Sequence, residues 1–227
     1  MSLKHKTAQE IFDLLKQEDI TSNYGSMYLD YLGIKVEIND KSPVGYIMQS
    51  WLGKWLESQG IDYNEPSNSQ EFPDFFLDDN NKESLLEFKS FDYDANPNFD
   101  VANFEAYCRS LKTKAYRVDA DYLIFGYTLE DSKLRIKHMW LKKIWEITCP
   151  MNDYPIRNQK KQGMIYNIRP AIWYSKGAKY KPFNSREKFI NALNDTLLQY
   201  YKTSMQSAGW LDEVVQNYKH HTGKDLL

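Results

Sequence analysis

The sequence has 227 residues, of which 42% are apolar and 26% are charged, with 29 basic and 31 acidic side chains. This apolar content excludes an intrinsically disordered chain, and ten Gly with eight Pro exclude a collagen-like one. No stretch approaches the ~18 consecutive apolar residues of a membrane span, and two cysteines are too few for a disulfide framework. We therefore expect a soluble, intracellular globular protein.

The charged residues are unevenly distributed along the chain. Residues 1–102 carry 8 basic and 19 acidic side chains, whereas residues 103–188 carry 18 basic and 8 acidic ones. A segment this basic favours a surface for a polyanion, because neutralising phosphates releases their counterions. A solvated helix face that complements the acidic half would explain the same counts, so this alternative stays open.

Hydrophobic periodicity and turn residues predict interleaved helices and strands. In the first half we expect a helix over 7–17, a strand or hairpin over 28–38, a helix over 44–59, and strands over 72–77 and 84–91. In the second half we expect a helix over 103–117, strands over 122–127 and 134–139, a short helix over 142–146, an extended segment over 164–174, and helices over 184–202 and 211–218. This order predicts an α/β fold with a mixed central sheet.

The residues most informative about chemistry lie on the two strands predicted over 72–77 and 84–91. Glu87 and Lys89 are two positions apart, so both side chains should point to the same face of the sheet. Pairing of the strands through the turn over 78–81 would bring Asp74 close to Glu87. Two close carboxylates repel each other unless a cation lies between them, and hard oxygen ligands suit Mg²⁺.

A purely structural explanation of these residues is that Glu87 and Lys89 are ordinary exposed side chains on a half-buried hairpin. Their surroundings argue against it, because apolar residues flank them on both faces of the strand (Leu85, Leu86, Phe88 and Phe91). A carboxylate and an ammonium group on an enclosed strand require a partner or a function. The ammonium group of Lys89 could donate a hydrogen bond to an attacking water or stabilise developing negative charge.

Pro73-Asp74 and Glu87-Phe88-Lys89, between the predicted helices, resemble the PD-(D/E)XK nuclease superfamily, and within it the type II restriction endonucleases. Residues 60–75 are similar to the EcoRV-type core motif, and residues 165–174 are similar to the NgoBV and NlaIV group. The resemblance implies a restriction-endonuclease-like α/β core with a mixed central sheet flanked by helices. It implies a single domain over 1–227, with a catalytic core at about 42–127 and recognition and C-terminal helical elements at about 128–227.

The resemblance also implies roles for individual residues. Asp74 and Glu87 would bind Mg²⁺, one or two ions per site, together with the backbone carbonyl of Phe88. Lys89 would be the catalytic lysine. Gln49, on the preceding helix, would take the auxiliary position that is acidic in many relatives, which weakens the case for a second tightly held ion.

The implied activity is Mg²⁺-dependent cleavage of double-stranded DNA at a short palindromic site, leaving 5′-phosphate ends. A homodimer would cut the two strands symmetrically, in the bacterial cytoplasm and away from any membrane, and a cognate DNA methyltransferase would be encoded nearby. Two alternatives stay open from the sequence. One is a repair or junction nuclease of the same superfamily, and the other is a DNA-binding protein without catalysis.

The basic segment supplies candidates for DNA contacts. Arg and Lys side chains read guanine edges and Asn and Gln side chains read adenine edges, while other basic residues contact phosphates. A polar solvated loop would have the same composition. The candidates are Arg157, Asn158, Gln159, Lys160, Lys161, Gln162, Asn167, Arg169, Lys176 and Lys179.

Overall fold

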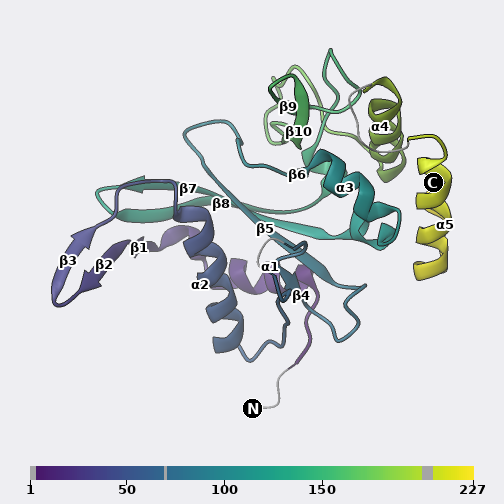
Figure 1. Ribbon diagram of the computed structural model, residues 1–227. Coiled ribbons are helices and arrows are strands. Elements are labelled where there is room, and N and C mark those ends of the chain that lie inside the picture. Colours follow the sequence, from purple (N-terminus) through teal and green to yellow (C-terminus); the bar gives the residue numbers. More distant parts are fainter. Residues whose placement is uncertain (1–3, 69–70, 201–206) are drawn as a thin grey trace. The chain divides into compact units, whose positions relative to one another are not determined.

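The computed structural model describes residues 4–68, 71–200 and 207–227 (Figure 1). The helices are α1 (Ala8–Gln17), η1 (Ile20–Ser22), α2 (Val44–Ser58), α3 (Phe104–Leu111), η2 (Ala115–Asp119), η3 (Ile144–Ile147), α4 (Arg186–Gln199) and α5 (Trp210–Thr222), where η marks a 3-10 helix. The strands are β1 (Tyr24–Ser26), β2 (Tyr28–Tyr31), β3 (Ile34–Glu37), β4 (Phe75–Phe76), β5 (Leu85–Asp92), β6 (Ala102–Asn103), β7 (Asp121–Glu130), β8 (Lys133–Lys143), β9 (Asn158–Lys161) and β10 (Met164–Ile168).

The chain forms two compact units. The first unit comprises Met1–Pro97 and Asp121–Leu141, and the second comprises Asn98–Ala120 and Lys142–Leu227. By sequence, the first unit carries 11 basic and 21 acidic side chains, and the second carries 18 basic and 10 acidic ones. The charge asymmetry along the sequence therefore follows the division into units. A single domain over 1–227 stays a prediction from the sequence.

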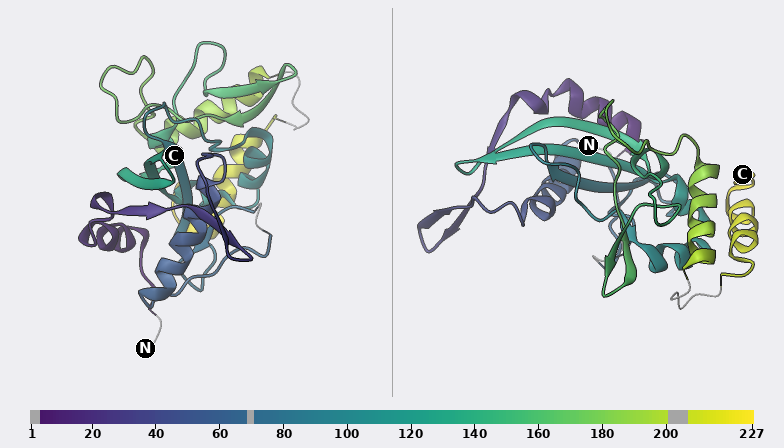
Figure 2. Two further views of the ribbon diagram at one scale, coloured as in Figure 1. Left: turned by 90° about the vertical axis from the view of Figure 1, so that its left-hand side faces the viewer. Right: turned by 90° about the horizontal axis from the view of Figure 1, so that it is seen from above.

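The first unit is built on a five-stranded sheet with the strand order β1-β8-β7-β5-β4. Strands β5 and β7 are parallel, whereas β4 pairs with β5 and β1 pairs with β8 in the antiparallel sense. This confirms the predicted mixed central sheet and α/β fold. A separate hairpin, β2–β3, reaches away from the sheet (Figure 2).

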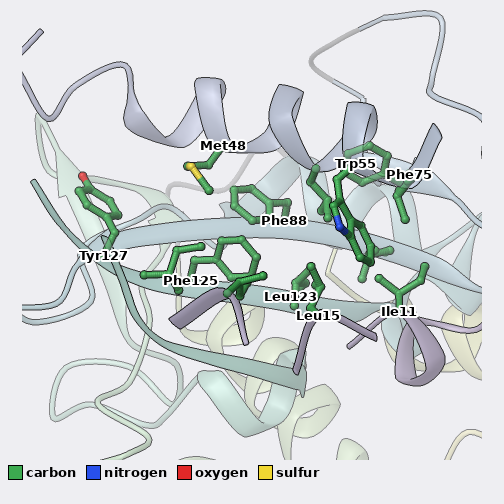
Figure 3. Close-up of a cluster of buried hydrophobic side chains, with 14 of the residues drawn as sticks. Ile11, Leu15, Met48, Trp55, Phe75, Phe88, Leu123, Phe125 and Tyr127 are labelled. Atoms are coloured by element: carbon green, nitrogen blue, oxygen red, sulfur yellow. The ribbon is translucent and has the colours of Figure 1, made fainter. Parts of the chain in front are cut away.

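Helices α1 and α2 supply one side of the core of the first unit. Met48 and Trp55 of α2 pack in one buried cluster with Phe88 of β5 and Phe125 of β7 (Figure 3). The rings of Phe88 and Phe125 meet edge to face, with their centroids 5.1 Å apart. Because Phe88 points into this cluster, alternation along β5 directs its neighbours Glu87 and Lys89 to the opposite face.

Local signals in the sequence define the ends of α1 and α2. Helix α1 begins with a capping box: Thr7 accepts a hydrogen bond from the backbone of Glu10, and the Glu10 side chain accepts one from the backbone of Thr7. Helix α2 follows Pro43 and ends just before Gly60, whose φ of 66° is the left-handed conformation favoured after a helix. The position of α2 matters because it carries Gln49.

The second unit contains a three-stranded sheet, in which β10 lies between β6 and β9, and the helices α3, α4 and α5. The buried Trp210 of α5 donates a hydrogen bond from its indole nitrogen to the carbonyl of Cys108 in α3, at 2.8 Å. Asp119 accepts hydrogen bonds from Arg186 of α4 at 2.9 Å and from Tyr218 of α5 at 2.5 Å. These contacts join the three helices of this unit.

Several predicted elements differ in length from those observed. The helix over 103–117 ends at Leu111, because the N–H of Ala115 donates to the side chain of Asn217 instead of continuing the helix. Strand β8 extends to Lys143, so the predicted helix over 142–146 becomes the following 3-10 turn. The extended segment predicted over 164–174 pairs with other strands only as far as Ile168, where β10 ends. The predicted end of the helix over 184–202 lies outside the described residues.

The strand expected over 72–77 is reduced to Phe75–Phe76 for a reason that concerns the candidate site. Pro73 has no N–H to donate to a ladder. The N–H of Asp74 donates instead to the side chain of Glu87. The pairing with β5 therefore starts only after the residues that carry the chemistry.

None of the helices within residues 4–68, 71–200 and 207–227 has both the length and the apolar character that crossing a membrane requires.

Candidate active site

The candidate site lies where the β4–β5 hairpin begins, in the first unit. Phe75 pairs with Leu86 and Phe76 pairs with Leu85, so Asp74 and Glu87 lie next to each other just beyond the last pair. The expected convergence of Asp74 and Glu87 is therefore present. The short connection between the strands fixes this register, and a slip by one residue would turn Glu87 into the core.

Hydrogen bonds hold the carboxylate of Asp74 from two sides. Its Oδ1 accepts from the amide Nε2 of Gln49 at 2.9 Å, and its Oδ2 accepts from the backbone N–H of Phe88 at 2.8 Å. The backbone N–H of Asp74 donates in turn to Oε2 of Glu87 at 3.1 Å. Gln49 of α2, which is predicted as an auxiliary residue, thus donates a hydrogen bond that holds the Asp74 carboxylate in place.

Lys89 completes the cluster through an ion pair. Its Nζ lies 2.7 Å from Oε1 of Glu87, and the two side chains are 21% and 8% exposed. The predicted common face and enclosed setting of Glu87 and Lys89 are therefore both observed. A buried charge lowers the stability of the folded state unless it is paired. The ion pair with Glu87 therefore compensates for the burial of both groups.

The two carboxylates repel each other in a setting that contains little water. Burial, followed by the charge of Glu87, raises the pKa of Asp74 to about 7, and the ammonium group of Lys89 only partly opposes this rise. An acidic side chain held in this state binds either a proton or a cation near neutral pH. The electrostatics of the site therefore favour a positive ion beside Asp74 and Glu87.

The oxygen ligands in the cluster fit Mg²⁺ better than a transition metal. Among the described residues, no group of three or more His, Cys, Asp or Glu side chains could hold a metal. The cluster instead offers two carboxylates, and backbone oxygens such as the Phe88 carbonyl lie on the same strand. A small set of hard oxygen ligands is typical of Mg²⁺, which keeps several waters in its shell.

The raised pKa of Asp74 predicts a pH dependence of folding stability. Because the folded-state pKa is about 7 and the ordinary value is 3.8, the folded protein binds this proton more tightly than the unfolded chain. Its contribution to the free energy of unfolding is complete below pH 4 and is lost as the pH rises through 7. Without divalent ions, we expect the wild-type value to fall by about 2 to 4 kcal/mol relative to Asp74→Asn between pH 4 and 7.5.

Urea titrations of both proteins across this pH range measure the difference. Asp79→Asn, which changes an exposed carboxylate in the turn between the strands, controls for substitution alone. Millimolar Mg²⁺ should stabilise the wild type at pH 7.5 and leave Asp74→Asn unchanged. Parallel pH profiles for wild type and Asp74→Asn would contradict the proposed electrostatics.

The candidate DNA contacts all lie in the second unit, and they differ in exposure. Asn158 and Asn167 are 8% and 5% exposed, and both donate hydrogen bonds within the unit, to the Ile156 carbonyl and the Gln159 side chain respectively. Arg169 is half-buried and pairs with Asp100. A DNA contact by these side chains would need the β9–β10 hairpin to rearrange.

The other candidates are more accessible. Lys160 is exposed and pairs with Asp153 at 2.9 Å, while the Nζ of Lys161 lies 3.9 Å from the ring centre of Tyr166. Gln162 occupies the hairpin turn with a φ of 51°. Arg157 and Gln159 are partly exposed, and Lys176 and Lys179 are exposed on the segment after β10. These side chains are the accessible ones among the candidates for DNA contact.

Comparisons with known proteins show which family the chain belongs to. The family described as NgoBV restriction endonuclease matches residues 5–227. The chain is 38% identical over 224 residues to the type II restriction enzyme NlaIV of Neisseria lactamica, covering 97% of this chain and 92% of that protein. It is 37% identical over 160 residues to the type II restriction enzyme NgoBV of Neisseria gonorrhoeae, covering 69% and 90%.

A solved structure gives the same result in three dimensions. The NlaIV restriction endonuclease superposes with a TM-score of 0.94 at 36% identity, covering 100% of this chain and 94% of that one. Fold and sequence together define a type II restriction endonuclease, a site-specific deoxyribonuclease. The chain belongs to the NgoBV restriction endonuclease family. The predicted fold class, enzyme class and NgoBV/NlaIV grouping are thereby confirmed, while the roles of individual residues stay predictions.

Proposed function

We propose that this enzyme hydrolyses double-stranded DNA at a short palindromic site with Mg²⁺, and that Asp74, Glu87 and Lys89 perform the reaction. The observation that carries the proposal is the cluster in which Asp74 contacts Gln49 and Phe88, and Glu87 contacts both Asp74 and Lys89. Burial and the charge of Glu87 raise the pKa of Asp74, which supports a site that accepts a cation.

In this proposal the side chains have distinct tasks. Asp74 and Glu87, with the Phe88 carbonyl, hold Mg²⁺, and Gln49 keeps the Asp74 carboxylate oriented. Bound there, Mg²⁺ supplies positive charge against the phosphoryl oxygens as negative charge develops on them. Lys89 lies beside Glu87, so its ammonium group is next to the phosphate that the metal would bind. There it donates a hydrogen bond to the attacking water or to a phosphoryl oxygen.

The reaction adds water across one phosphodiester bond. The water oxygen forms a bond to phosphorus, the bond from phosphorus to the 3′ oxygen breaks, and the 3′ oxygen takes up a proton. The products are a 5′-phosphate and a 3′-hydroxyl. Cutting both strands of a palindrome requires two such sites related by a two-fold axis, which supports a homodimer.

The basic second unit supports a role in DNA binding. Its excess of basic side chains attracts the phosphate backbone, and the accessible residues Lys160, Lys161, Gln162, Lys176 and Lys179 can reach a ligand without rearrangement. We further expect a cognate DNA methyltransferase gene near this one and a cytoplasmic location, because the host DNA requires protection from the enzyme.

Plasmid cleavage tests the proposal. Purified protein with Mg²⁺ should convert unmethylated plasmid into discrete fragments, and EDTA should stop the reaction, because the carboxylates alone supply no positive charge. DNA ligase should rejoin the fragments without prior kinase treatment, since ligation needs a 5′-phosphate. Cleavage that persists in EDTA would refute the metal requirement, and fragments that ligate only after phosphorylation would refute the proposed bond cleavage.

A further inference from the structure

A group of aromatic rings lies on the face of the five-stranded sheet that also carries Glu87 and Lys89 of the candidate active site. Strands β5, β7 and β8 lie side by side in this sheet (Figure 1). Because Phe88 points into the core, alternation along β5 places Phe91 on the opposite face, together with the two charged residues. Two positions along a strand span about 7 Å, so the backbone of Phe91 lies about that far from the backbone of Lys89.

Four residues form this aromatic cluster: Phe91 of β5, Tyr93 just after β5, and His138 and Trp140 of β8. The ring of Trp140 stacks on those of Phe91, Tyr93 and His138, with centroids 5.8, 6.3 and 5.7 Å apart. The rings of Tyr93 and His138 lie 4.6 Å apart. Phe91 is 2% exposed, Tyr93 and Trp140 are partly exposed, and His138 is exposed. The aromatic cluster therefore begins in the interior and ends at the surface.

A glycine in the strand between them lets two of these rings pack on the backbone. Gly126 of β7 pairs with Phe91, and a Cβ atom at this position would lie 2.8 Å from the ring of Tyr93 and 3.2 Å from that of Trp140. Any other residue would therefore displace the ring of Tyr93. Glycine weakens the interior of a strand and often marks the close approach of another group. Here it fixes where the partly exposed rings lie.

The alternation along β8 shifts by one position at the aromatic cluster. Leu134 and Ile136 lie in the core of the first unit, and Met139 and Leu141 pack against the same core. Unbroken alternation would have buried His138 in that core as well. A shift of one position is what a β-bulge produces, and bulges beside active sites change the direction of side chains. The shift turns the imidazole of His138 toward the face of the candidate active site.

The part of β8 in the first unit is also basic, although that unit as a whole is acidic. It carries Lys133, Arg135 and Lys137 and no acidic side chain. Lys137 is exposed and forms no ion pair with any described residue. The ring nitrogens of the neighbouring His138 likewise form no hydrogen bond within the described part of the chain. A cation and a hydrogen-bond donor are therefore available beside the aromatic rings.

We propose that Lys137, His138 and the rings of Tyr93 and Trp140 bind the sugar–phosphate backbone of DNA beside the phosphate that is cleaved. Lys137 contacts a phosphate, the imidazole of His138 donates a hydrogen bond to a phosphate oxygen, and the partly exposed rings pack against deoxyribose. The proposal rests on the proposed function and deepens it, since it assigns a DNA contact to the first unit. These are positioning residues, because backbone contacts fix where the duplex lies and read no sequence.

Chemistry and location favour the DNA backbone over a protein as the occupant of this surface. Lysine and imidazole groups bind phosphate, and aromatic side chains with a polar atom suit a surface that is apolar at one end and wet at the other. The aromatic cluster shares its face with Lys89, so a strand whose phosphate is held at Lys89 continues beside it. Because the first unit is acidic as a whole, the contact acts at short range, and long-range attraction comes from the second unit.

The salt dependence of DNA binding tests the proposal. Binding of a fluorescent duplex taken from the plasmid of the cleavage assay is titrated in EDTA over a range of NaCl concentrations. Each phosphate contact contributes about 0.9 to the slope of log affinity against log salt concentration. Lys137→Gln should therefore lower this slope by about one and weaken binding about three- to tenfold. Lys54→Gln changes an exposed lysine on α2 of the same unit and should alter neither quantity.

A hydroxyl-radical footprint locates the contact on the DNA. Wild type should protect the sugars beside the cleaved phosphate. His138→Ala should lose protection at those sugars and keep it elsewhere, which a damaged fold would not do. Because Lys137 and His138 are exposed, both variants should keep the wild-type thermal midpoint.

A double variant of Lys137→Gln with His138→Ala that binds with wild-type affinity and salt slope overturns the proposal. A footprint that the double variant leaves unchanged, or loses uniformly, overturns it as well. The binding titration needs no cleavage, so a reduced salt slope supports this surface even if plasmid is never cut. Normal cleavage by wild type, combined with an unchanged salt slope in the double variant, refutes this surface and leaves the proposed function intact.

Discussion

Replacing Glu87 by Gln should reduce the rate of DNA cleavage at least about a thousandfold, because several kcal/mol of charge stabilisation at the phosphate are lost. The change removes one negative charge and almost no volume. The amide oxygen of the substituted side chain can still accept the hydrogen bond that the Asp74 backbone now donates to Oε2 of Glu87. The variant should therefore fold, while its affinity for Mg²⁺ falls sharply because only one carboxylate remains.

Two measurements separate loss of the metal from loss of the fold. Isothermal titration with Mg²⁺ should show binding to wild type and none to Glu87→Gln, while the thermal midpoints without metal stay within a few degrees. Asp79→Asn, an exposed carboxylate 87% accessible in the adjoining turn, should cut DNA like wild type. A Glu87→Gln variant that binds Mg²⁺ normally, or cleaves within tenfold of wild type, would remove Glu87 from the metal site.

The convergence of Asp74 and Glu87 could be predicted because it depends on local features. A short polar turn joins the two strands, and alternation along the second strand fixes which side chains share a face. The apolar neighbours of Glu87 also indicated its burial, and it is 6% exposed. The hydrogen bond that Gln49 donates to the Asp74 carboxylate was not predictable from these local features, because it depends on where α2 packs against the sheet.

The candidate DNA contacts show the limit of composition as a guide. The amide side chains of Asn158 and Asn167 can read adenine, but both are buried and donate hydrogen bonds within the second unit. Residue type states what a side chain can bind, whereas the direction in which a hairpin faces is set by tertiary packing. The accessible lysines on the same segment remain predictions of phosphate contacts.

The β2–β3 hairpin illustrates a different limit. Alternating apolar residues over 34–38 predicted a strand or hairpin, which the structure confirms. Such alternation normally indicates a face buried in the same chain. Here the apolar face is exposed, and no feature of a single sequence distinguishes a strand whose apolar side is buried from one whose apolar side faces solvent.

The structure separates two tasks that the sequence mixes. The acidic first unit contains the carboxylate cluster, and a site that gathers negative charge repels the DNA backbone unless positive ions are present. In the proposed function, the basic second unit provides the attraction for DNA that the first unit lacks. We therefore expect that mutations can change metal dependence without changing DNA affinity. Lys89 tests this expectation, because it lies in the candidate active site of the first unit.

Replacing Lys89 by Gln should lower the cleavage rate about a hundred- to a thousandfold while leaving DNA affinity within a few-fold of wild type. Lys89 lies in the first unit with Nζ 2.7 Å from Glu87, so the proposed function places its action at the reacting phosphate and not along the DNA backbone. Single-turnover cleavage with saturating enzyme measures the chemical step, and a binding titration in EDTA measures affinity. Lys54→Gln, a lysine 77% exposed on α2, is the matched control and should change neither quantity.

The pH profile of the Lys89→Gln variant distinguishes catalysis from a structural role. Without the ammonium group, only the hydrogen bonds from Phe88 and Gln49 oppose the effects of burial and of the Glu87 charge, so the pKa of Asp74 should rise further above 7. The residual cleavage should therefore reach its plateau at higher pH than wild type and should require more Mg²⁺ at pH 7. Lys89→Arg should restore the wild-type pH profile, because it restores the charge, but only part of the rate. A Lys89→Gln variant with the wild-type rate would exclude Lys89 from the reaction, and a lower rate with an unshifted profile would show that the lysine does not set the charge state of the carboxylates.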